Sequence, residues 1–377
     1  MAALQPAEER RGGRGRATSR DVAAASGVSQ ATVSNVINHP DLVAPETRER
    51  VREAMDKLDF VVHQPARLLR AGRAAAIGLC VPDVGNPFWG EVTRGAAAAA
   101  TEHGAALIVC STEESAAKEA DLLRLLEQQR VGAILVAPLE PDLAELDRFV
   151  ERGTPVALLN RRDKRGLLPF VTVDDVEGAR MVGEYLLALG HRRIAVVNGS
   201  TVISWCADRW RGICLAVEQA GLDPEDVLYQ VPVDAQKASE GERVASDVLE
   251  LAPRVTAVFC VNDLLGLGVL RGLTRRGVSV PKDISLVGYD DDEFTEMLLP
   301  ALTTVRQEPH RLGYSAAARL IQRKVLGSPT SAEVAGSILV PELVVRESAR
   351  RPRGTPAGQI VPLKQQWATL DTLNDRL

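Results

Sequence analysis

Two kinds of hydrophobic pattern alternate along most of the chain, from about residue 74 to about residue 350. Short, continuous apolar runs are separated by longer stretches in which apolar residues recur every three or four positions. The short runs have the length and β-branched content of buried strands, and the longer stretches are long enough for crossover helices. The alternation predicts an α/β body with parallel sheets that are covered by helices on both faces.

Eight of the apolar runs are candidate strands, and the stretch 115–129, with Leu122, Leu125 and Leu126, is a typical candidate helix between two of them. Periodicity alone leaves open whether the strands form one large sheet or two smaller ones. In chain order the candidate strands are AAIGLCVP, ALIVCS, GAILVAP, PVALLN, FVTVD, RIAVVNG, TAVFCVN and SLVGYD.

The pattern near the N-terminus is different, because apolar residues there are few and fall on short helical stripes. In GVSQATVSNVIN, Gly27 supplies a tight turn and Ser29 suits the N-cap of a helix over residues 30–37. Val33, Val36 and Ile37 fall on its inner face, while the polar entry of the helix stays exposed. With the short helix predicted over SRDVAAASG, this is the pattern of a helix-turn-helix, whose second helix reads base edges in the major groove.

A third helix is predicted after Pro45, which suits a first helical turn. Its apolar residues recur at helical spacing, and Phe60 closes the small core: Val51, Ala54, Met55 and Leu58. Residues 1–73 hold 12 Lys/Arg and 9 Asp/Glu, a formal charge of +3, whereas the remainder of the chain carries −8, which gives the total of −5. A basic head on an acidic body is compatible with DNA binding by the head.

The segment TSRDVAAASGVSQATVSNVINHPDLVAPETRERVREAMDKLDF resembles the head of the lactose-repressor-type family of bacterial transcription regulators. The following VVHQPARLLRAGR resembles the hinge helix of that family, and the resemblance continues through the body to about residue 348. It implies a body of two similar lobes, like the periplasmic sugar-binding proteins. It also implies a dimer that binds a near-palindromic operator in double-stranded DNA and responds to a small-molecule effector, which in this family is commonly a sugar.

The resemblance assigns base reading to Gln30, Ala31 and Asn35 on the second helix. Many members carry Arg at the position of Asn35, and Arg is the residue that most often contacts guanine. The operator is therefore expected to differ from the common half-site of the family. Phosphate contacts, which position a protein without specifying sequence, are expected from the other polar residues of the head: Thr18, Ser29, Thr32, Ser34 and Asn38.

The hinge is expected to act as a second reading device. In the family, paired hinge helices enter the minor groove, and a leucine from each wedges between base steps. Leu69 matches that leucine and Arg67 precedes it. This chain departs from the family in having Val62 and His63 where Pro-Asn is usual.

Polar and aromatic residues follow several of the predicted strands, at the edge where parallel sheets bind ligands. Aromatic faces stack on sugar rings, and Arg, Asn and Asp pair with hydroxyls, so this composition suits a sugar. At Asn160 many sugar binders of the family carry Asp, so this chain lacks a strong anionic acceptor there. The resemblance and the strand ends together predict these effector-binding residues: Phe88, Trp89, Asn160, Arg161, Trp205, Arg209, Asn262, Tyr289, Asp290 and Gln307.

The expected organisation follows from these segments. A C-terminal leucine heptad would favour a tetramer, but Leu363, Leu370, Leu373 and Leu377 do not keep that spacing, so we expect a homodimer. The predicted parts are a basic tail (1–16), the helix-turn-helix domain (17–61), the hinge (62–73), a first lobe (about 74–174 and 305–335), a second lobe (about 175–304 and 336–350) and a C-terminal tail (351–377).

Other classes of protein fit the sequence less well. A transporter's sugar-binding module is disfavoured by the helix-turn-helix and by the lack of a signal-peptide pattern. An enzyme is disfavoured because GLGVLRG at 266–272 fails the dinucleotide spacing, and the histidines and the acidic run DDDE show no metal-ligand spacing. The five cysteines form no CxxC pair and suit buried free thiols. We therefore expect a cytoplasmic transcription regulator, in most family members a repressor, without cofactor, metal or membrane partner.

Overall fold

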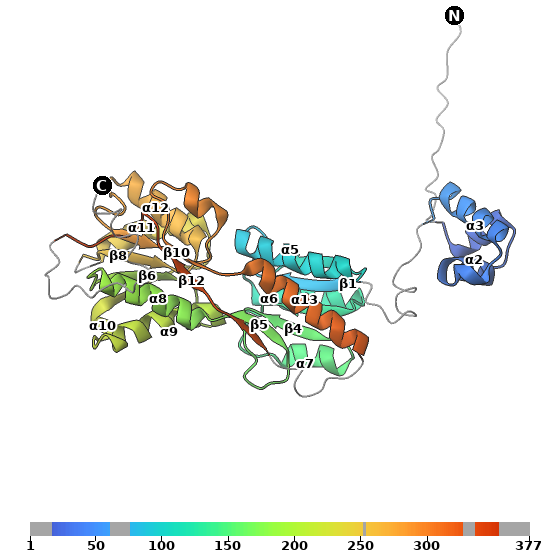
Figure 1. Ribbon diagram of the computed structural model, residues 1–377, viewed down its shortest axis with the longest axis horizontal. Coiled ribbons are helices and arrows are strands. Elements are labelled where there is room, and N and C mark those ends of the chain that lie inside the picture. The colour runs from blue at the N-terminus through green and yellow to red at the C-terminus, as the bar shows by residue number, and fades with distance from the viewer. Residues whose placement is uncertain (1–16, 61–75, 252–253, 327–335, 354–377) are drawn as a thin grey trace, which may run out of the picture. The chain divides into compact units, whose positions relative to one another are not determined.

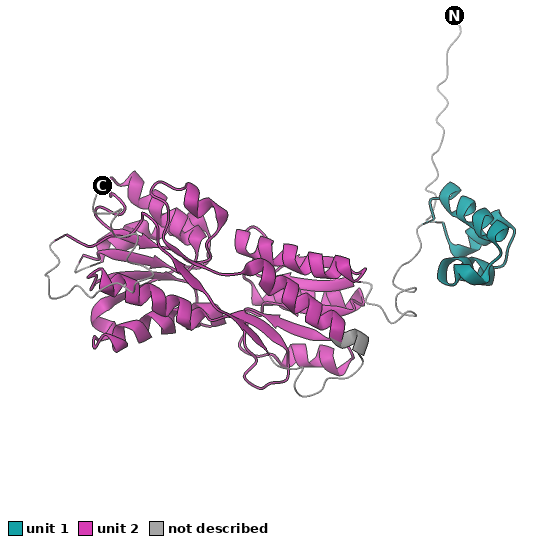
Figure 2. Cartoon of the chain, in the orientation of Figure 1, with its two compact units in different colours: residues 1–72 teal, residues 73–377 magenta. Residues whose placement is uncertain are grey.

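The computed structural model describes residues 17–60, 76–251, 254–326 and 336–353. The chain divides into two compact units, residues 1–72 and residues 73–377 (Figure 2). Each unit is described by itself below, and the larger one is called the body.

The small unit is a three-helix head. Helices α1 (Ser19–Ser26) and α2 (Gln30–Asn38) are joined by a turn at Gly27, whose φ of 67° is left-handed and therefore favours glycine. The 3₁₀ helix η1 (Pro40–Leu42) and the helix α3 (Pro45–Lys57) follow. The predicted helix-turn-helix and its small core are confirmed, and the buried residues come from all three α-helices: Val22, Ala23, Val33, Val36, Val51 and Ala54.

The first lobe of the body contains a six-stranded parallel sheet with the strand order β11-β5-β4-β3-β1-β2 (Figure 1). Continuous apolar runs form its central strands because both faces are covered. Helices α5 and α13 cover one face, and α6 and α7 cover the other. The elements are β1 (Ala76–Val81), α5 (Pro87–Glu102), β2 (Ala106–Ser111), α6 (Ala116–Gln128), β3 (Ala133–Val136), α7 (Ala144–Glu151), β4 (Val156–Leu159), β5 (Phe170–Val173), α13 (Pro309–Leu326) and β11 (Ser337–Leu339).

The second lobe contains a four-stranded parallel sheet with the order β7-β6-β8-β9. An antiparallel pair, β10 (Thr304–Arg306) with β12 (Glu342–Val344), lies beside it through the bridge between Asp290 and Arg306. The remaining elements are α8 (Asp175–Ala188), β6 (Ile194–Asn198), α9 (Ser204–Gln219), α10 (Pro224–Val227), β7 (Leu228–Pro232), α11 (Ala238–Glu250), β8 (Ala257–Cys260), α12 (Asp263–Arg275), β9 (Ser285–Val287) and η2 (Glu293–Met297).

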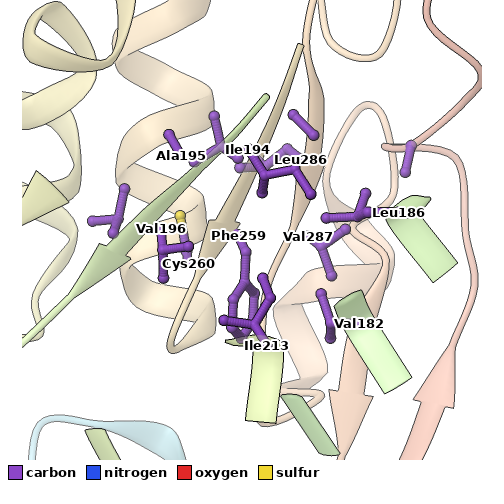
Figure 3. Packing of buried hydrophobic residues seen from close by; sticks show 14 of the residues in the cluster. Val182, Leu186, Ile194, Ala195, Val196, Ile213, Phe259, Cys260, Leu286 and Val287 are labelled. Carbon is purple, nitrogen blue, oxygen red and sulfur yellow. The ribbon is translucent and has the colours of Figure 1, made fainter. Parts of the chain in front are cut away.

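Each lobe is held together by apolar packing between its sheet and its helices. In the second lobe, Phe259 of β8 packs among Val182 of α8, Ile213 of α9 and Val287 of β9, all buried (Figure 3). In the first lobe, α5 and α13 pack closely because two glycines lie where they meet. A Cβ at Gly95 would lie 2.0 Å from the carbonyl oxygen of His310, and one at Gly313 would lie 1.9 Å from that of Val92, so neither position can carry a side chain.

The structure confirms all eight predicted strands and corrects the picture at three places. The segment LYQVP forms the edge strand β7, which the pattern analysis missed because Gln230 and Pro232 interrupt its apolar run. The three-residue strands β10 and β11 are too short to show a period. The expectation that residues 336–350 belong to the second lobe is wrong for β11, because Ser337–Leu339 pairs with β5 in the sheet of the first lobe.

Some expectations concern parts of the chain outside the described residues. They are the basic tail 1–16, the hinge residues 62–73 with Arg67 and Leu69, and most of the C-terminal tail. Of the helices in the described residues, none combines the length and apolar character that crossing a lipid bilayer requires.

The buried His191 gives the body a defined response to acid. Its ring bonds Thr256 Oγ1 at 2.9 Å and the carbonyl oxygen of Arg350 at 3.0 Å, and burial lowers its pKa from 6.5 to about 4. Between these two values the unfolded chain binds a proton that the folded body does not. The free energy of unfolding should therefore fall as the pH drops from about 6.5 towards 4, by on the order of 1 kcal/mol per pH unit.

Urea denaturation at several pH values measures this slope. His191→Gln should flatten it, whereas His310→Gln, which changes an exposed histidine, should keep the wild-type slope. An unchanged slope in His191→Gln would assign the acid response to other groups.

Candidate functional site

The exposed face of α2 is the part of the head that can contact other molecules. Gln30, Ala31 and Asn35, the predicted base-reading residues, are all exposed. Val33 and Val36 on the opposite side are buried against α1 and α3. The helix therefore presents two amide side chains and one methyl group outward from a rigid support.

The predicted phosphate-contacting residues already hold one another in place. The Ser29 hydroxyl accepts a hydrogen bond from the Thr32 main-chain N–H at 3.0 Å and lies 2.9 Å from the Thr32 hydroxyl. Asn38 Nδ2 donates to the Ser34 carbonyl oxygen at 2.8 Å and to its hydroxyl at 3.1 Å. Thr18 caps α1 in a reciprocal arrangement with Asp21. These bonds fix both ends of α2 and the start of α1, so the head meets a ligand with little further ordering.

In the body, aromatic residues from both lobes meet. Trp89 of α5 lies edge-on to its neighbour Phe88, with 5.0 Å between ring centroids. It lies 6.0 Å from Trp205 of α9, at an interplanar angle of 64°. All three side chains are buried, and Trp205 packs into the core cluster of the first lobe. The structure therefore brings together three of the predicted effector-binding residues from α5 and α9.

The centre of the second lobe's strand-end edge is a buried arginine. Arg209 Nε donates to Asp175 Oδ1 at 2.8 Å, its Nη1 donates to the carbonyl oxygen of Val261, and that Nη1 lies 3.6 Å from Asp290 Oδ1. The guanidinium carbon lies 3.7 Å from the centre of the Tyr289 ring, a cation–π contact. Gln307 Nε2 donates to Asp290 Oδ1 at 2.6 Å. We call Asp175, Arg209, Tyr289, Asp290 and Gln307 the arginine cluster.

Burial dominates the electrostatics of the arginine cluster. It raises the pKa of Asp175 above its usual value and that of Asp290 well above it, while the positive charge of Arg209 opposes both shifts. Burial also raises the pKa of the Tyr289 hydroxyl well above its usual value, so the phenol stays protonated. One guanidinium thus serves two carboxyl groups, and the cluster offers hydrogen-bond acceptors rather than free cations.

Asn160 and Gln307 belong to a set of five buried side chains that keep a polar atom without a partner in the described residues; the others are Asn198, Tyr289 and Asp292. Within the described ranges, Asn160 Oδ1 and Gln307 Oε1 are buried and accept no hydrogen bond. An unsatisfied buried polar atom costs about 1–3 kcal/mol, so such atoms mark positions where a ligand can supply a donor. Asn160 also has a left-handed backbone, with φ of 51°, and its carbonyl oxygen accepts from Ser204 Oγ of α9 at 3.4 Å.

Two predicted residues have other partners. Asn262 is the N-cap of α12: its Oδ1 accepts from the Leu265 N–H at 2.8 Å and its Nδ2 donates to the Gln236 carbonyl at 3.1 Å. Arg161 turns towards the main chain, where its guanidinium donates to the carbonyl oxygens of Glu140 and Pro141. The structure therefore does not join Arg161 to the arginine cluster.

An open cavity of about 450 Å³ lies beside this edge, and Arg161 is the one predicted effector-binding residue that lines it. We call it the interlobe cavity because residues of both lobes form its wall. They are Pro141, Asp142, Leu143, Arg161, Arg162, Asp163, Lys164 and Arg165 of the first lobe, with Val176, Ser204, Ala207, Asp208 and Arg211 of the second.

The sequence analysis missed Asp175, the closest partner of Arg209. The signal was present, because Asp174 and Asp175 directly follow the strand FVTV at its carboxyl end. Asp174 caps α8 by accepting from the Glu177 N–H, which leaves Asp175 to enter the core. Among the described residues, no group of three or more His, Cys, Asp or Glu side chains is arranged to hold a metal ion.

Comparisons with known proteins agree with this architecture. Residues 18–62 match the model of the bacterial regulatory proteins of the lacI family, and residues 184–349 match a periplasmic binding protein-like domain. The chain is similar to the HTH-type transcriptional repressor PurR of Vibrio atlanticus (strain LGP32), with 33% identity over 311 residues that span 81% of this chain and 92% of the relative.

Solved structures show the same fold. The lac repressor dimer bound to operator and the anti-inducer ONPF superposes with a TM-score of 0.74 at 26% identity, over 89% of this chain and all of that one. The complex of the transcriptional regulator CelR with cellobiose superposes with a TM-score of 0.65 at 30% identity, over the same shares of the two chains.

The pairing of Asp175 with Arg209 can be tested by stability. Asp175→Asn removes a buried negative charge next to a buried guanidinium, so the free energy of unfolding should fall by on the order of 3 kcal/mol. Asp147→Asn, which breaks the exposed pair between Asp147 and Arg165, should cost less than about 1 kcal/mol. Urea denaturation followed by tryptophan fluorescence compares the two variants, and equal losses would mean that Asp175 is uncharged in the folded body.

Proposed function

This chain belongs to the lacI family of bacterial regulatory proteins, which are transcription regulators and not enzymes, and we propose that it is a cytoplasmic, dimeric, sugar-responsive repressor. The observation that carries the proposal is the combination of a rigid, outward-facing α2 in the head with buried, unsatisfied acceptors in the body. The first suits DNA and the second suits a polyhydroxylated ligand.

Operator reading is assigned to α2. Gln30 and Asn35 are exposed amides, which pair with adenine or with phosphate, and Ala31 offers a methyl contact to thymine. The ordered pairs Ser29–Thr32 and Ser34–Asn38 lie at the start and end of the same helix, where they can contact the sugar-phosphate backbone. Arg67 and Leu69 of the hinge are proposed to contact the minor groove.

The effector is proposed to be a sugar or sugar derivative held by the arginine cluster and the aromatic residues. The ring faces of Phe88, Trp89 and Trp205 suit the apolar face of a sugar, and Asn160 Oδ1, Gln307 Oε1 and Asp290 suit its hydroxyl groups. The similar regulator CelR is solved with cellobiose, which supports this ligand class.

Effector binding is proposed to act through the angle between the lobes. On the side of Glu114 and Asp83, a hydrogen bond and an ion pair join the two lobes. Glu114 accepts from the Gln236 N–H at 3.2 Å, and Lys237 Nζ lies 3.6 Å from Asp83 Oδ2. Because these bonds change if one lobe rotates, a ligand that prefers one arrangement shifts the equilibrium between the two.

Self-association is supported by apolar side chains that a lone chain would leave in water. Ile108 and Val109 lie 38% and 40% exposed on β2, at the edge of the first lobe's sheet. In the second lobe, Met297 at the end of η2 and Leu299 just after it are 71% and 91% exposed. Patches of this kind suit a homodimer interface, and a dimer would present two heads to a near-palindromic operator.

The operator-reading role of α2 is tested first by selecting binding sites from a random DNA pool with the full chain. A near-palindromic site is expected. Gln30→Ala should then weaken binding to the selected site by about 1–3 kcal/mol, a loss of up to about a hundredfold, because a base contact is removed.

Binding of Gln30→Ala to unrelated DNA should stay at the wild-type level, and Asp56→Asn on the exposed side of α3 should keep full affinity for the selected site. Equal weakening on both kinds of DNA would mean that Gln30 contacts the sugar-phosphate backbone of the DNA and not its bases.

The effector role of Asn160 is tested with the sugar that alters operator binding in a panel of pentoses, hexoses and disaccharides. Asn160→Gly keeps the left-handed backbone available and breaks no side-chain bond made by Oδ1, but it removes an acceptor for the sugar. The affinity for that sugar should fall between about twofold and tenfold, with unchanged affinity for the operator in its absence.

Arg130→Gly is the matched control, because Arg130 is an exposed residue of the same lobe with a φ of 52°. If the sugar affinity of Asn160→Gly equals that of this control, Asn160 does not contact the sugar.

A further inference from the structure

The interlobe cavity is separated from the arginine cluster by α9. Trp205 and Arg209 are buried on one side of this helix. The residues that line the cavity lie on the other side of the helix, at positions i, i+3, i+4 and i+7: Ser204, Ala207, Asp208 and Arg211. A cavity of about 450 Å³ is large enough for a phosphorylated sugar or a molecule of similar size. The arginine cluster and the aromatic residues proposed to hold the sugar do not line this cavity.

More cationic than anionic side chains line the interlobe cavity. Its wall holds five cationic side chains, Arg161, Arg162, Lys164, Arg165 and Arg211, against the three carboxylates of Asp142, Asp163 and Asp208, a balance of +2. Carboxylates just outside the wall offset this difference in part, since Arg165 pairs with Asp147 at 2.7 Å and Arg162 lies 3.5 Å from Asp174.

Two of the three carboxylates are already occupied. Asp163 accepts hydrogen bonds from the Leu167 N–H at 3.0 Å and the Leu168 N–H at 2.9 Å, and it pairs with Arg165 Nε at 3.0 Å. Asp142 accepts from the Ala144 N–H at 2.9 Å. Asp208 is half-buried, and burial raises its pKa, although Arg162, Lys164 and Arg211 act in the opposite direction. Asp147 and Asp174 lie outside the wall and pair with Arg165 and Arg162, so an anion site there depends on the cations that remain unpaired.

Two of the cations are free to bind a ligand. Lys164 and Arg211 are exposed, and neither makes a hydrogen bond or an ion pair with any residue in the part of the chain that the structure describes. They come from different lobes. A third cation, Arg161, donates to two main-chain carbonyl oxygens and not to a carboxylate. An anion between Lys164 and Arg211 would be held by both lobes at once.

The start of α9 adds a favourable field. The N-cap residue Ile203 provides no side-chain hydrogen bond to the first turn, although this helix has 16 residues. The N-terminus of a helix attracts negative charge, and Ser204, its first residue, lines the cavity. The helix adds to the attraction that the unpaired Lys164 and Arg211 offer an anion.

We propose that the interlobe cavity is a second ligand site, which binds a small molecule carrying a phosphate group through Lys164 of the first lobe and Arg211 of the second. A phosphate dianion matches these two unpaired cations, and its several oxygens can reach donors that approach from separate directions. Binding itself is independent of the proposed function. Its regulatory consequence rests on that function, because a ligand that ties the lobes together would alter operator affinity.

Isothermal titration of the full chain with inorganic phosphate, at an ionic strength matched with chloride, tests the site. One phosphate per chain should bind. Lys164→Gln combined with Arg211→Gln should weaken that binding at least tenfold, whereas the matched control, Lys282→Gln combined with Arg254→Gln, should bind as the wild type does, since both control residues are exposed cations outside the cavity.

Three outcomes would overturn the proposal: phosphate binding within twofold of wild type in the cavity variant, heats no larger than those from chloride, or acetate that binds as tightly as phosphate. The proposed function is judged separately, because the cavity variant should keep wild-type operator affinity and sugar response in phosphate-free buffer. Failure of those two properties in the wild type itself would count against the regulator and not against the phosphate site.

Discussion

The architecture of the second lobe depends on the burial of one guanidinium group. Arg209 is 3% exposed, and it links the start of α8 through Asp175, the end of β8 through the Val261 carbonyl and the segment after β9 through Asp290 and Tyr289. A buried arginine is tolerated only when its donors are satisfied, so these segments must lie where they do. The same constraint places Asp290 next to Gln307, close to a crossover between the lobes.

This constraint also explains why the ligand site lies at the strand ends. The polar groups around Arg209 are themselves short of partners. Asp290 Oδ1 contacts both Arg209 and Gln307, and Gln307 Oε1 accepts no hydrogen bond from the described residues. The hydrogen bonds around the guanidinium are complete, but those at the outer edge of the cluster are not. The unpaired atoms destabilise the empty site, and the hydroxyl groups of a ligand can pair with them. Stability and ligand recognition thus share the same side chains.

Much of the fold could be predicted from the sequence because buried parallel strands and helix stripes leave strong local patterns. The runs around Phe259 and Val197 are apolar throughout, so their strands were found, whereas β7 at a sheet edge carries Gln230 and Pro232 and was not. Of the residues predicted at strand ends, Tyr289 and Asp290 do lie next to Arg209.

The pairings inside the site could not be predicted. Asp175 and Arg209 are 34 positions apart, and no local pattern shows that their side chains meet. Arg161 follows a strand just as the other site residues do, yet its guanidinium turns to the carbonyls of Glu140 and Pro141, because the loop after β3 lies closer to it than the arginine cluster does. The interlobe cavity was invisible for a similar reason, since its wall is assembled from loops and from one face of α9.

Helix α9 links the arginine cluster to the interlobe cavity mechanically. One side of it carries Trp205 into the first lobe's core and Arg209 into the arginine cluster, and the other side carries Asp208 and Arg211 to the interlobe cavity. A helix of 16 residues moves as a unit, because its main-chain hydrogen bonds resist bending over so short a length. Any rotation of the second lobe that relieves or strains the contacts of Arg209 must therefore change the distance between Arg211 and the loop of Lys164. Ligands on the two sides of α9 cannot be independent, and the sign of their coupling depends on whether both prefer the same angle between the lobes.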